Sequence, residues 1–178
     1  MGSDDKRWWD IISVACKPGA GEEAWCDGLH RELTKLPVDD ILAFDRWFED
    51  RFAEANTHDL CVAKYYATGF GGEDSFCYFR CWLIAQGRTA YYNAIANADS
   101  LADLDMSDDA QAEIFAEAQR AWATVTGKSW DEYVCPPGHP GRGEMVGEVW
   151  DDSDPAEMKR RLPRLVAKYG STNGWSNG

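Results

Sequence analysis

Residues 37–55, PVDDILAFDRWFEDRFAEA, form the clearest amphipathic stretch of the sequence. Large apolar side chains recur there every three or four residues, which places them on one face of an α-helix. They are Ile41, Phe44, Phe48, Phe52 and Ala55. Proline suits the first turn of a helix, where its missing N–H leaves no bond unmade. We therefore predict a helix that begins at Pro37 and buries this face.

The same helical spacing continues on both sides of this stretch, and no convincing run alternates strictly between apolar and polar residues as a half-buried strand would. Glycines and prolines mark the breaks. Further helices are predicted over about 4–16, 22–36, 58–68, 74–86, from 88, over 107–127, at 130–133 and over 154–169 with a break at Pro163. We therefore predict an all-α protein, a single irregular bundle of about eight helices over residues 1–170, with a disordered tail at 171–178.

The aromatic and acidic residues refine two of these helices. Acids at positions 108 and 109 suit the positive N-terminal end of the helix over 107–127. Its buried stripe is expected to hold Ile114, Phe115, Ala118, Trp122 and Val125. Near the N-terminus, Trp8 and Trp9 are adjacent and cannot face the same way, so one of them is expected near the surface, where it would be a candidate for a partner contact.

The net charge of −13 excludes some partners. Nucleic-acid phosphates and anionic membrane surfaces would be repelled, and no apolar run approaches the roughly 20 residues of a membrane span. The basic residues cluster in one place, which we expect to be the surface of the last helix: Lys159, Arg160, Arg161, Arg164 and Lys168. We therefore expect neither nucleic acid nor a membrane as partner.

The N-terminal residues lack the basic and apolar regions of a signal peptide, so we expect the chain to stay in the cytoplasm. Six cysteines are present. In a reducing compartment a disulfide framework is not expected, and most of these residues should be buried free thiols.

The segment from Leu60 to Leu101 contains, in order, a set of short motifs. They are Ala63-Lys64-Tyr65-Tyr66, Gly69, Gly71-Gly72, Asp74-Ser75-Phe76, Phe79-Arg80-Cys81-Trp82-Leu83-Ile84 and Gln86-Gly87. This segment resembles the bacterial domain of unknown function 4240. Shorter similarities at 9–12, 41–45, 99–102, 162–165 and 169–170 extend the resemblance along the chain, and the cysteines at 61, 77 and 81 depart from the family pattern. The resemblance implies no known activity.

A metal site is one hypothesis for the cysteines. Cys77 and Cys81 lie four residues apart and would share one helical face, and Cys135 and His139 would add a third thiolate and an imidazole. Zinc prefers such ligands, although structural zinc sites more often use a C-x-x-C spacing. The alternative is that these cysteines are small buried apolar residues, and we predict no cofactor, with zinc as the candidate exception.

Catalytic motifs are not evident. The three histidines have no nucleophile beside them, and the sequence contains neither a G-x-S-x-G elbow, a G-x-G-x-x-G loop nor a P-loop. An enzyme is therefore the less favoured interpretation.

The most suggestive polar pair is Asp74 and Arg80, six residues apart near the start of a predicted helix and flanked by aromatic residues. One interpretation is structural, with the arginine tying loops together and Asp74 capping the helix. The other is that the pair recognises a small ligand or a peptide end. The aromatic residues that would line such a groove are Tyr65, Tyr66 and Trp82.

These observations favour a cytoplasmic binding or accessory module with a protein or small-molecule partner. Two alternatives stay open: a metal-binding or thiol-dependent enzyme that uses Cys77, Cys81, Cys135 and His139, and an acidic immunity-type protein that neutralises a basic partner. The sequence identifies neither the partner nor the oligomeric state.

Overall fold

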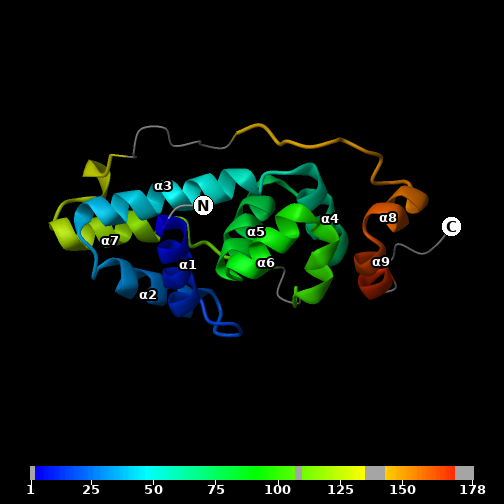
Figure 1. The fold of residues 1–178 in the computed structure, drawn as a ribbon. Coiled ribbons are helices and arrows are strands. Elements are labelled where there is room, and N and C mark those ends of the chain that lie inside the picture. The colour runs from blue at the N-terminus through cyan, green and yellow to red at the C-terminus, as the bar shows by residue number, and fades with distance from the viewer. Residues whose placement is uncertain (1–2, 107–109, 135–142, 171–178) are drawn as a thin grey trace.

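The computed structural model describes residues 3–106, 110–134 and 143–170 (Figure 1). This part of the chain is predominantly helical and contains one isolated β-bridge in place of a sheet. Its helices are α1 (Ser3–Ala15), α2 (Glu22–Leu33), α3 (Val38–Glu54), α4 (His58–Thr68), α5 (Glu73–Ala85), α6 (Arg88–Ala96), η1 (Ala98–Asp103), α7 (Glu117–Thr126), η2 (Trp130–Glu132), α8 (Pro155–Arg161) and α9 (Pro163–Tyr169). The prediction of an all-α bundle is confirmed. The tail predicted at 171–178 lies outside the described residues.

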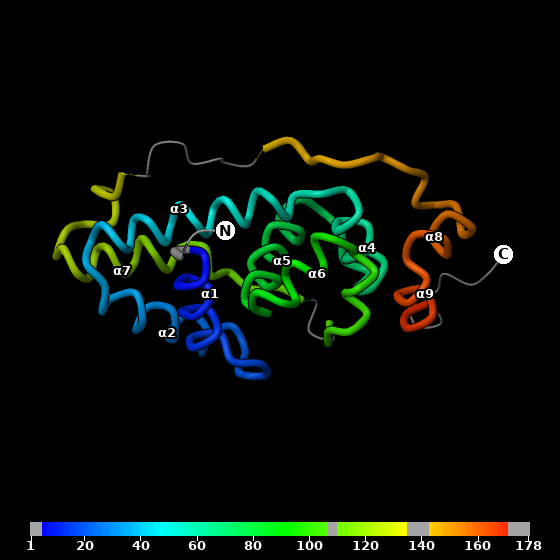
Figure 2. The backbone as a smooth tube through the Cα atoms, in the orientation of Figure 1, coloured from blue at the N-terminus to red at the C-terminus, as the bar shows by residue number. Residues whose placement is uncertain are grey.

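The helices form an elongated arrangement along α3, as the backbone tube in Figure 2 shows. Helices α1, α2 and α7 gather with α3 at one end, α4, α5 and α6 follow, and α8 and α9 lie at the other end. The described segment that precedes α8, from residue 143, is extended and runs along the bundle, where Val146 meets the junction between α3 and α4. None of the helices in the described ranges is long and apolar enough to cross a membrane.

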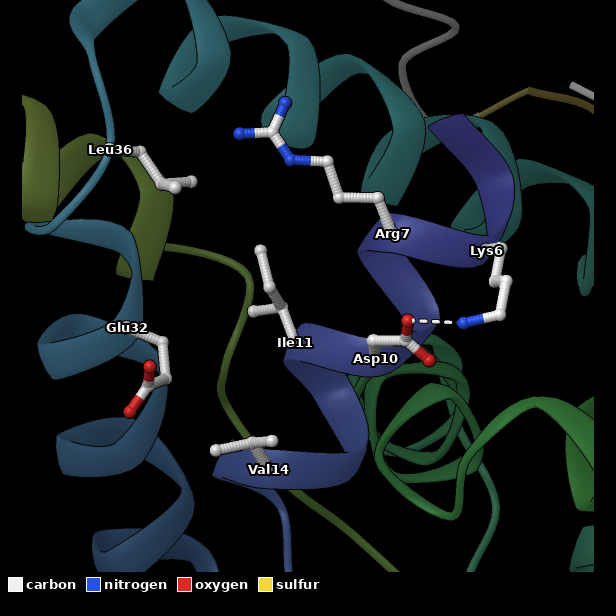
Figure 3. Close-up of a pocket in the computed structure, with 7 residues that line it drawn as sticks. All are labelled: Lys6, Arg7, Asp10, Ile11, Val14, Glu32 and Leu36. Atoms are coloured by element: carbon white, nitrogen blue, oxygen red, sulfur yellow. Dashed lines mark hydrogen bonds and ion pairs between the residues drawn. The ribbon is translucent and has the colours of Figure 1, made fainter. Parts of the chain in front are cut away.

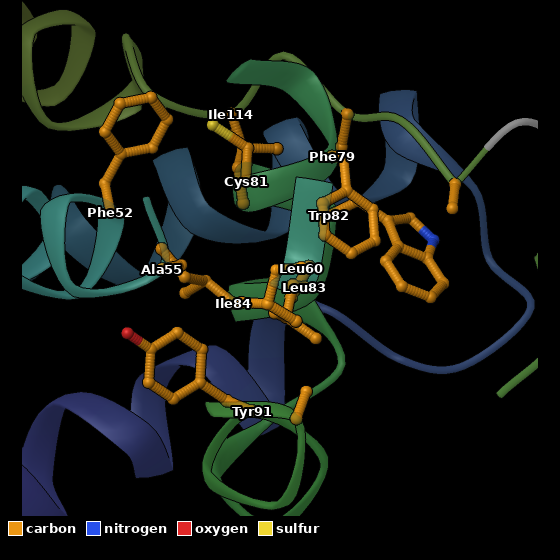
Figure 4. Close-up of a cluster of buried hydrophobic side chains, with 14 of the residues drawn as sticks. Phe52, Ala55, Leu60, Phe79, Cys81, Trp82, Leu83, Ile84, Tyr91 and Ile114 are labelled. Carbon is orange, nitrogen blue, oxygen red and sulfur yellow. The ribbon is translucent and has the colours of Figure 1, made fainter. Parts of the chain in front are cut away.

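Helix α5 lies at the centre of the core, and nine of its 13 residues are buried. Figure 4 shows its side chains among residues from α3, α4 and α6 and from the segment before α7. The labelled residues are Phe52, Ala55, Leu60, Phe79, Cys81, Trp82, Leu83, Ile84, Tyr91 and Ile114. Packing on almost every side explains why α5 has no polar stripe in its second half.

The prediction that Trp8 or Trp9 lies near the surface is wrong. Trp8 is 4% exposed and packs edge-on against Phe44, at 5.8 Å between ring centroids. Trp9 is 3% exposed and contacts Trp47 at 4.9 Å. Helix α1 packs against α2, α3 and α5, so adjacent positions on it face different parts of the same core.

The helix predicted over 107–127 begins only at Glu117. Before it, alternate residues are buried at Ala110, Ala112 and Ile114, and the Ala112 N–H donates to the Tyr78 carbonyl oxygen at 3.1 Å. This period of two is that of an extended chain lying on α5. Phe115, which was predicted to be buried, is consequently 41% exposed.

Three other helix boundaries differ from those predicted. Helix α2 ends at Leu33, three residues before the predicted end, and α3 begins at Val38 with Pro37 as its N-cap. The predicted cap of α5, Asp74 or Ser75, is replaced by Gly72, whose φ of 102° favours glycine. The predicted break at Pro163 divides α8 from α9.

Helix α9 is attached to the bundle through Asp99 of η1. The Asp99 carboxylate is buried and accepts hydrogen bonds from the backbone N–H groups of Arg164 and Leu165, both at 3.0 Å. These N–H groups belong to the first turn of α9, which has no intrahelical acceptor for them. One side chain thus caps a helix that is distant in sequence.

We expect Asp99→Ala to lower the free energy of unfolding by about 1–3 kcal/mol, because it leaves two N–H groups in a buried position without an acceptor. Urea unfolding followed by circular dichroism measures this. The matched control is Asp103→Ala on the same short helix, which removes only an exposed pair with the Arg164 side chain and should cost less than about 1 kcal/mol. Equal losses in both variants would contradict the capping role.

Candidate functional site

Three surface cavities in the described part of the chain are candidate sites. The first lies between α1 and α2, has a volume of about 460 Å³ and is shown in Figure 3. Ile11 and Val14 extend from α1 toward α2, and the charged side chains of this helix hold partners within the fold: Lys6 pairs with Asp10 at 2.7 Å and Arg7 with Asp40 at 2.6 Å. This groove therefore offers no charge that needs a ligand.

The second cavity, of about 420 Å³, lies between α1 and α3. Its deepest carboxylate, Asp5, accepts a hydrogen bond from Trp47 Nε1 at 3.0 Å and pairs with Arg51 at 3.4 Å. The polar groups on its floor are therefore engaged by the protein itself.

The third cavity lies at Arg80 and has a volume of about 370 Å³. We call it the Arg80 cavity. Four parts of the chain line it: the α3–α4 turn, α4, the N-cap and one face of α5, and the segment before α8. The lining residues are, in the same order, Asn56; Cys61; Gly72, Glu73, Phe76 and Arg80; Gly143 and Met145. Positions 73, 76 and 80 fall on one face of α5 because they are spaced by three and four residues.

Arg80 is 97% removed from solvent, with 3% of its surface exposed. Its Nη1 donates to the Phe52 carbonyl oxygen and its Nη2 to Cys77 Sγ, both at 3.2 Å. The guanidinium carbon lies 3.8 Å from the centre of the Phe52 ring and 5.2 Å from that of Phe76. Cation–π contact of this kind contributes about 0.5–2 kcal/mol, which offsets only part of the cost of burying a charge.

No carboxylate in the described part of the chain pairs with Arg80. Its Nε–H is buried and has no hydrogen-bond acceptor among these residues. Buried arginines normally pair with an acidic group, because the positive charge otherwise loses most of its solvation. The Arg80 cavity therefore contains a cation with an unused donor.

The outer wall of the cavity is formed by residues 143–150, which we call the strap. Backbone bonds hold it against the α3–α4 turn: Val146 N–H donates to the Asn56 carbonyl oxygen and His58 N–H donates to that of Val146, both at 2.9 Å. At its end, Trp150 Nε1 donates to Asp59 Oδ1 at 2.7 Å. These bonds fix the position of Met145 at the cavity.

The predicted ligand-binding residues do not converge. Only Arg80 lines the cavity, and it forms no ion pair with Asp74, which is exposed in the first turn of α5. Tyr65 is 39% exposed, whereas Tyr66 and Trp82 are buried, and Trp82 stacks on Phe79 in the core. Of the five predicted residues, the structure thus places Arg80 in the lining of this cavity and the other four outside its described lining.

Sequence reasoning did not identify Asn56, Cys61, Glu73 or Met145 as residues of the site. Asn56 lies in the turn before α4 and Met145 in the extended strap, where no periodicity predicts which way a side chain faces. Glu73 was identifiable in principle, because it precedes Arg80 by two helical turns.

Lys64 is a second buried cation, 2% exposed, that the sequence did not single out. Its Nζ donates to the Phe70 carbonyl oxygen at 2.6 Å and to the Ser75 hydroxyl. These bonds tie α4 to the turn that precedes α5 and to the first turn of α5 itself. Lys64 thus has a structural role.

The cysteines proposed as metal ligands lie on α5, where Cys77 is 5% and Cys81 0% exposed. Cys135 and His139 lie outside the described residues. Within the residues described, no group of three or more histidine, cysteine, aspartate or glutamate side chains is placed to hold a metal ion. The described cysteines are free: Cys16, Cys26, Cys61, Cys77 and Cys81.

Burial suppresses ionisation of several of these thiols. It raises the pKa of Cys16 from its ordinary value of 9.0 to about 12, with a smaller contribution from Cys26. The pKa of Cys61, in the cavity, is also raised by burial, although Lys64 and Arg80 counteract this. A thiolate is the nucleophilic form of cysteine, so these residues are poor nucleophiles near neutral pH.

We predict a pH-dependent stability from Cys16. Between pH 9 and about 12 the unfolded chain loses the Cys16 proton while the folded protein keeps it, so the free energy of unfolding falls as the pH rises above 9. The slope from this group is at most about 1.4 kcal/mol per pH unit. In urea titrations at pH 8, 9 and 10, the free energy of unfolding should decline less steeply with pH in Cys16→Ala than in the parent protein. Ser13→Ala, an exposed change in the last turn of α1 close to Cys16, should leave the slope unaltered. Identical slopes in all three proteins would disprove the assignment.

The comparisons with known proteins define the family. Residues 3–126 match the family described as "Protein of unknown function (DUF4240)", so the chain belongs to that family. No curated protein and no solved structure matches the chain. The match contains Asn56, Cys61, Glu73 and Arg80 of the cavity, and the strap lies beyond it.

Proposed function

We propose that this protein is a small-molecule binding module, and that the Arg80 cavity binds the anionic group of a small organic acid. The observation that carries the proposal is the buried Arg80 guanidinium, which lines a cavity and pairs with no carboxylate in the described ranges. A carboxylate ligand would supply the missing anion and an acceptor for Nε–H.

The size and lining of the cavity suit such a ligand. Its volume of about 370 Å³ lies in the lower part of the usual range for ligand pockets, which is about 300–1,000 Å³. Apolar atoms of Phe76 and Met145 line it beside the charge, the combination expected where an apolar wall holds a ligand and a few polar groups orient it.

Binding is favoured over catalysis by the residues of the cavity. Cys61 is its one nucleophile among the described residues, and burial disfavours the thiolate. Among the described residues that line it, none is a histidine that could act as a base. We propose a cytoplasmic accessory role, in keeping with five free cysteines in the described part of the chain, since free thiols persist in a reducing compartment.

The test is binding of isovalerate, phenylacetate and inorganic phosphate, measured by calorimetry on the full chain and on Arg80→Met. We expect at least one of the two carboxylates to bind the parent protein with a Kd below about 1 mM. Loss of the charge-assisted hydrogen bonds in Arg80→Met should weaken that binding about 10–100-fold. Isovaleramide, which has no charge, should bind neither protein.

Stability distinguishes binding from a purely structural role. Methionine has an apolar side chain that can pack between Phe52 and Phe76, so Arg80→Met should be as stable as the parent protein or more stable. Arg31→Met is the matched control, because Arg31 is an exposed arginine on α2 and does not line the cavity. The proposal would be refuted if none of the acids bound. It would also be refuted if Arg80→Met lowered the free energy of unfolding by more than about 3 kcal/mol and left the binding unchanged.

A further inference from the structure

We infer that the ligand of the Arg80 cavity is an apolar 2-hydroxy acid, whose carboxylate pairs with Arg80 and whose hydroxyl group donates a hydrogen bond to the side-chain oxygen of Asn56. This inference rests on the proposed function, because it requires that the cavity bind a carboxylate. It adds the second polar group of the ligand and the residue that recognises it.

Asn56 supplies an acceptor to the cavity. The residue lines the cavity and is 8% exposed, and its Nδ2 donates to the Gly143 carbonyl oxygen at 2.7 Å. A carbonyl oxygen can only accept, so this bond fixes the orientation of the amide and leaves Oδ1 as its second polar group. Oδ1 accepts no hydrogen bond from the described part of the chain. It is therefore available to a donor that a ligand brings.

The end of α3 brings Asn56 and Arg80 close together. Arg80 Nη1 donates to the carbonyl oxygen of Phe52, in the last turn of α3. In a continuing helix the Asn56 N–H would donate to that oxygen, but it donates to the Ala53 carbonyl oxygen instead, at 3.0 Å. The guanidinium thus lies about one helical turn, or about 5.4 Å along the axis, before Asn56. The carboxylate and the hydroxyl of a 2-hydroxy acid are on adjacent carbons, so each can form a bond of about 2.8 Å to groups about 5–8 Å apart.

A single neutral acceptor favours a single neutral donor. A hydroxyl group donates one hydrogen bond, which matches Oδ1 of Asn56, whereas an ammonium group brings three donors and a charge. Glu73 is exposed and already takes part in another interaction, so it is given no contact with the ligand. A charged group without a partner costs more to bury than a hydroxyl group does. A keto group only accepts, and its oxygen would face Oδ1 with no hydrogen between them.

The other walls of the cavity indicate an apolar side chain on the ligand. Phe76, Met145 and the Cys61 thiol are the apolar groups of the described lining. Met145 is 45% exposed, although the strap around it is hydrogen-bonded to the α3–α4 turn. A methionine side chain adapts to the shape of what it contacts, so it can cover ligands of several sizes. A branched and an aromatic hydrocarbon group, as in 2-hydroxyisovalerate and mandelate, are therefore suitable probes.

The experiment measures Kd by calorimetry on the full chain for two series of acids that differ only at the carbon next to the carboxylate. The first series is isovalerate, 2-hydroxyisovalerate, 2-oxoisovalerate and valine, and the second is phenylacetate, mandelate, phenylglyoxylate and phenylglycine. The two enantiomers of each hydroxy acid are measured separately. We expect one enantiomer of at least one hydroxy acid to bind about 3–10-fold more tightly than its unsubstituted acid, the change of about 0.7–1.4 kcal/mol that one neutral hydrogen bond contributes. The oxo acid and the amino acid of that series should bind more weakly than the hydroxy acid.

Two variants that each remove one side-chain bond of the strap locate the hydroxyl group. Asn56→Ala removes the bond to the Gly143 carbonyl together with the Oδ1 acceptor, whereas Trp150→Phe removes only the bond from Trp150 Nε1 to Asp59. A looser strap affects an acid and its hydroxy acid alike, so the ratio of their two Kd values reports on the hydroxyl group. We expect Asn56→Ala to reduce the preference for the hydroxy acid to about 1-fold and Trp150→Phe to leave the ratio as in the parent protein.

The outcomes separate this inference from the proposed function. Hydroxy acids that bind no more tightly than the unsubstituted acids, or an oxo or amino acid that binds as tightly as its hydroxy acid, would overturn the hydroxyl contact while carboxylate binding stands. A preference that Asn56→Ala preserves would overturn its placement at Asn56. The two series on the parent protein decide the matter even where Asn56→Ala does not fold. If no acid of either series binds, the proposed function fails and this inference fails with it.

Discussion

The interaction on which the rest of the structure depends is the enclosure of α5 by its neighbours. Because the helix is buried on almost every side, each polar group on it needs a partner inside the protein. Arg80 receives a carbonyl oxygen, a sulfur and two aromatic ring faces, which orient the guanidinium and leave its charge uncompensated. In surroundings of low polarity such a charge interacts more strongly with a nearby anion than it would in bulk water.

The cavity is built from two parts of the chain with different positions in the sequence. Its inner groups, Asn56, Glu73 and Arg80, fall within the stretch that defines the family, and its outer wall comes from the strap beyond that stretch. The two parts are joined by hydrogen bonds of the α3–α4 turn. Asn56 takes part in both, because its backbone and Nδ2 hold the strap while its Oδ1 stays available. The polar groups and the apolar cover are thus separate elements.

Helical periodicity predicted most of this fold from the sequence, because apolar residues three and four apart define a buried face wherever it packs. It was wrong where burial had another origin. Ala110, Ala112 and Ile114 are spaced as in an extended chain, and Trp8 and Trp9 are both buried because α1 has neighbours on several sides. Arg80, which lines the cavity, was singled out from the sequence, but Glu73 on the same face of α5 was not. Asp74 and Arg80 are six residues apart, whereas residues that share a helical face are three, four or seven apart. The contact of Asn56 with the strap joins residues that are too distant in sequence for any local pattern to predict.

The acidity of the protein bears on the ligand as well. With a net charge of −13, the field around the molecule opposes the approach of any anion, and one buried cation reverses this only at short range. A ligand with a carboxylate alone meets this repulsion before it reaches Arg80. The Arg80 guanidinium therefore attracts an anionic group only over the short range of the cavity itself.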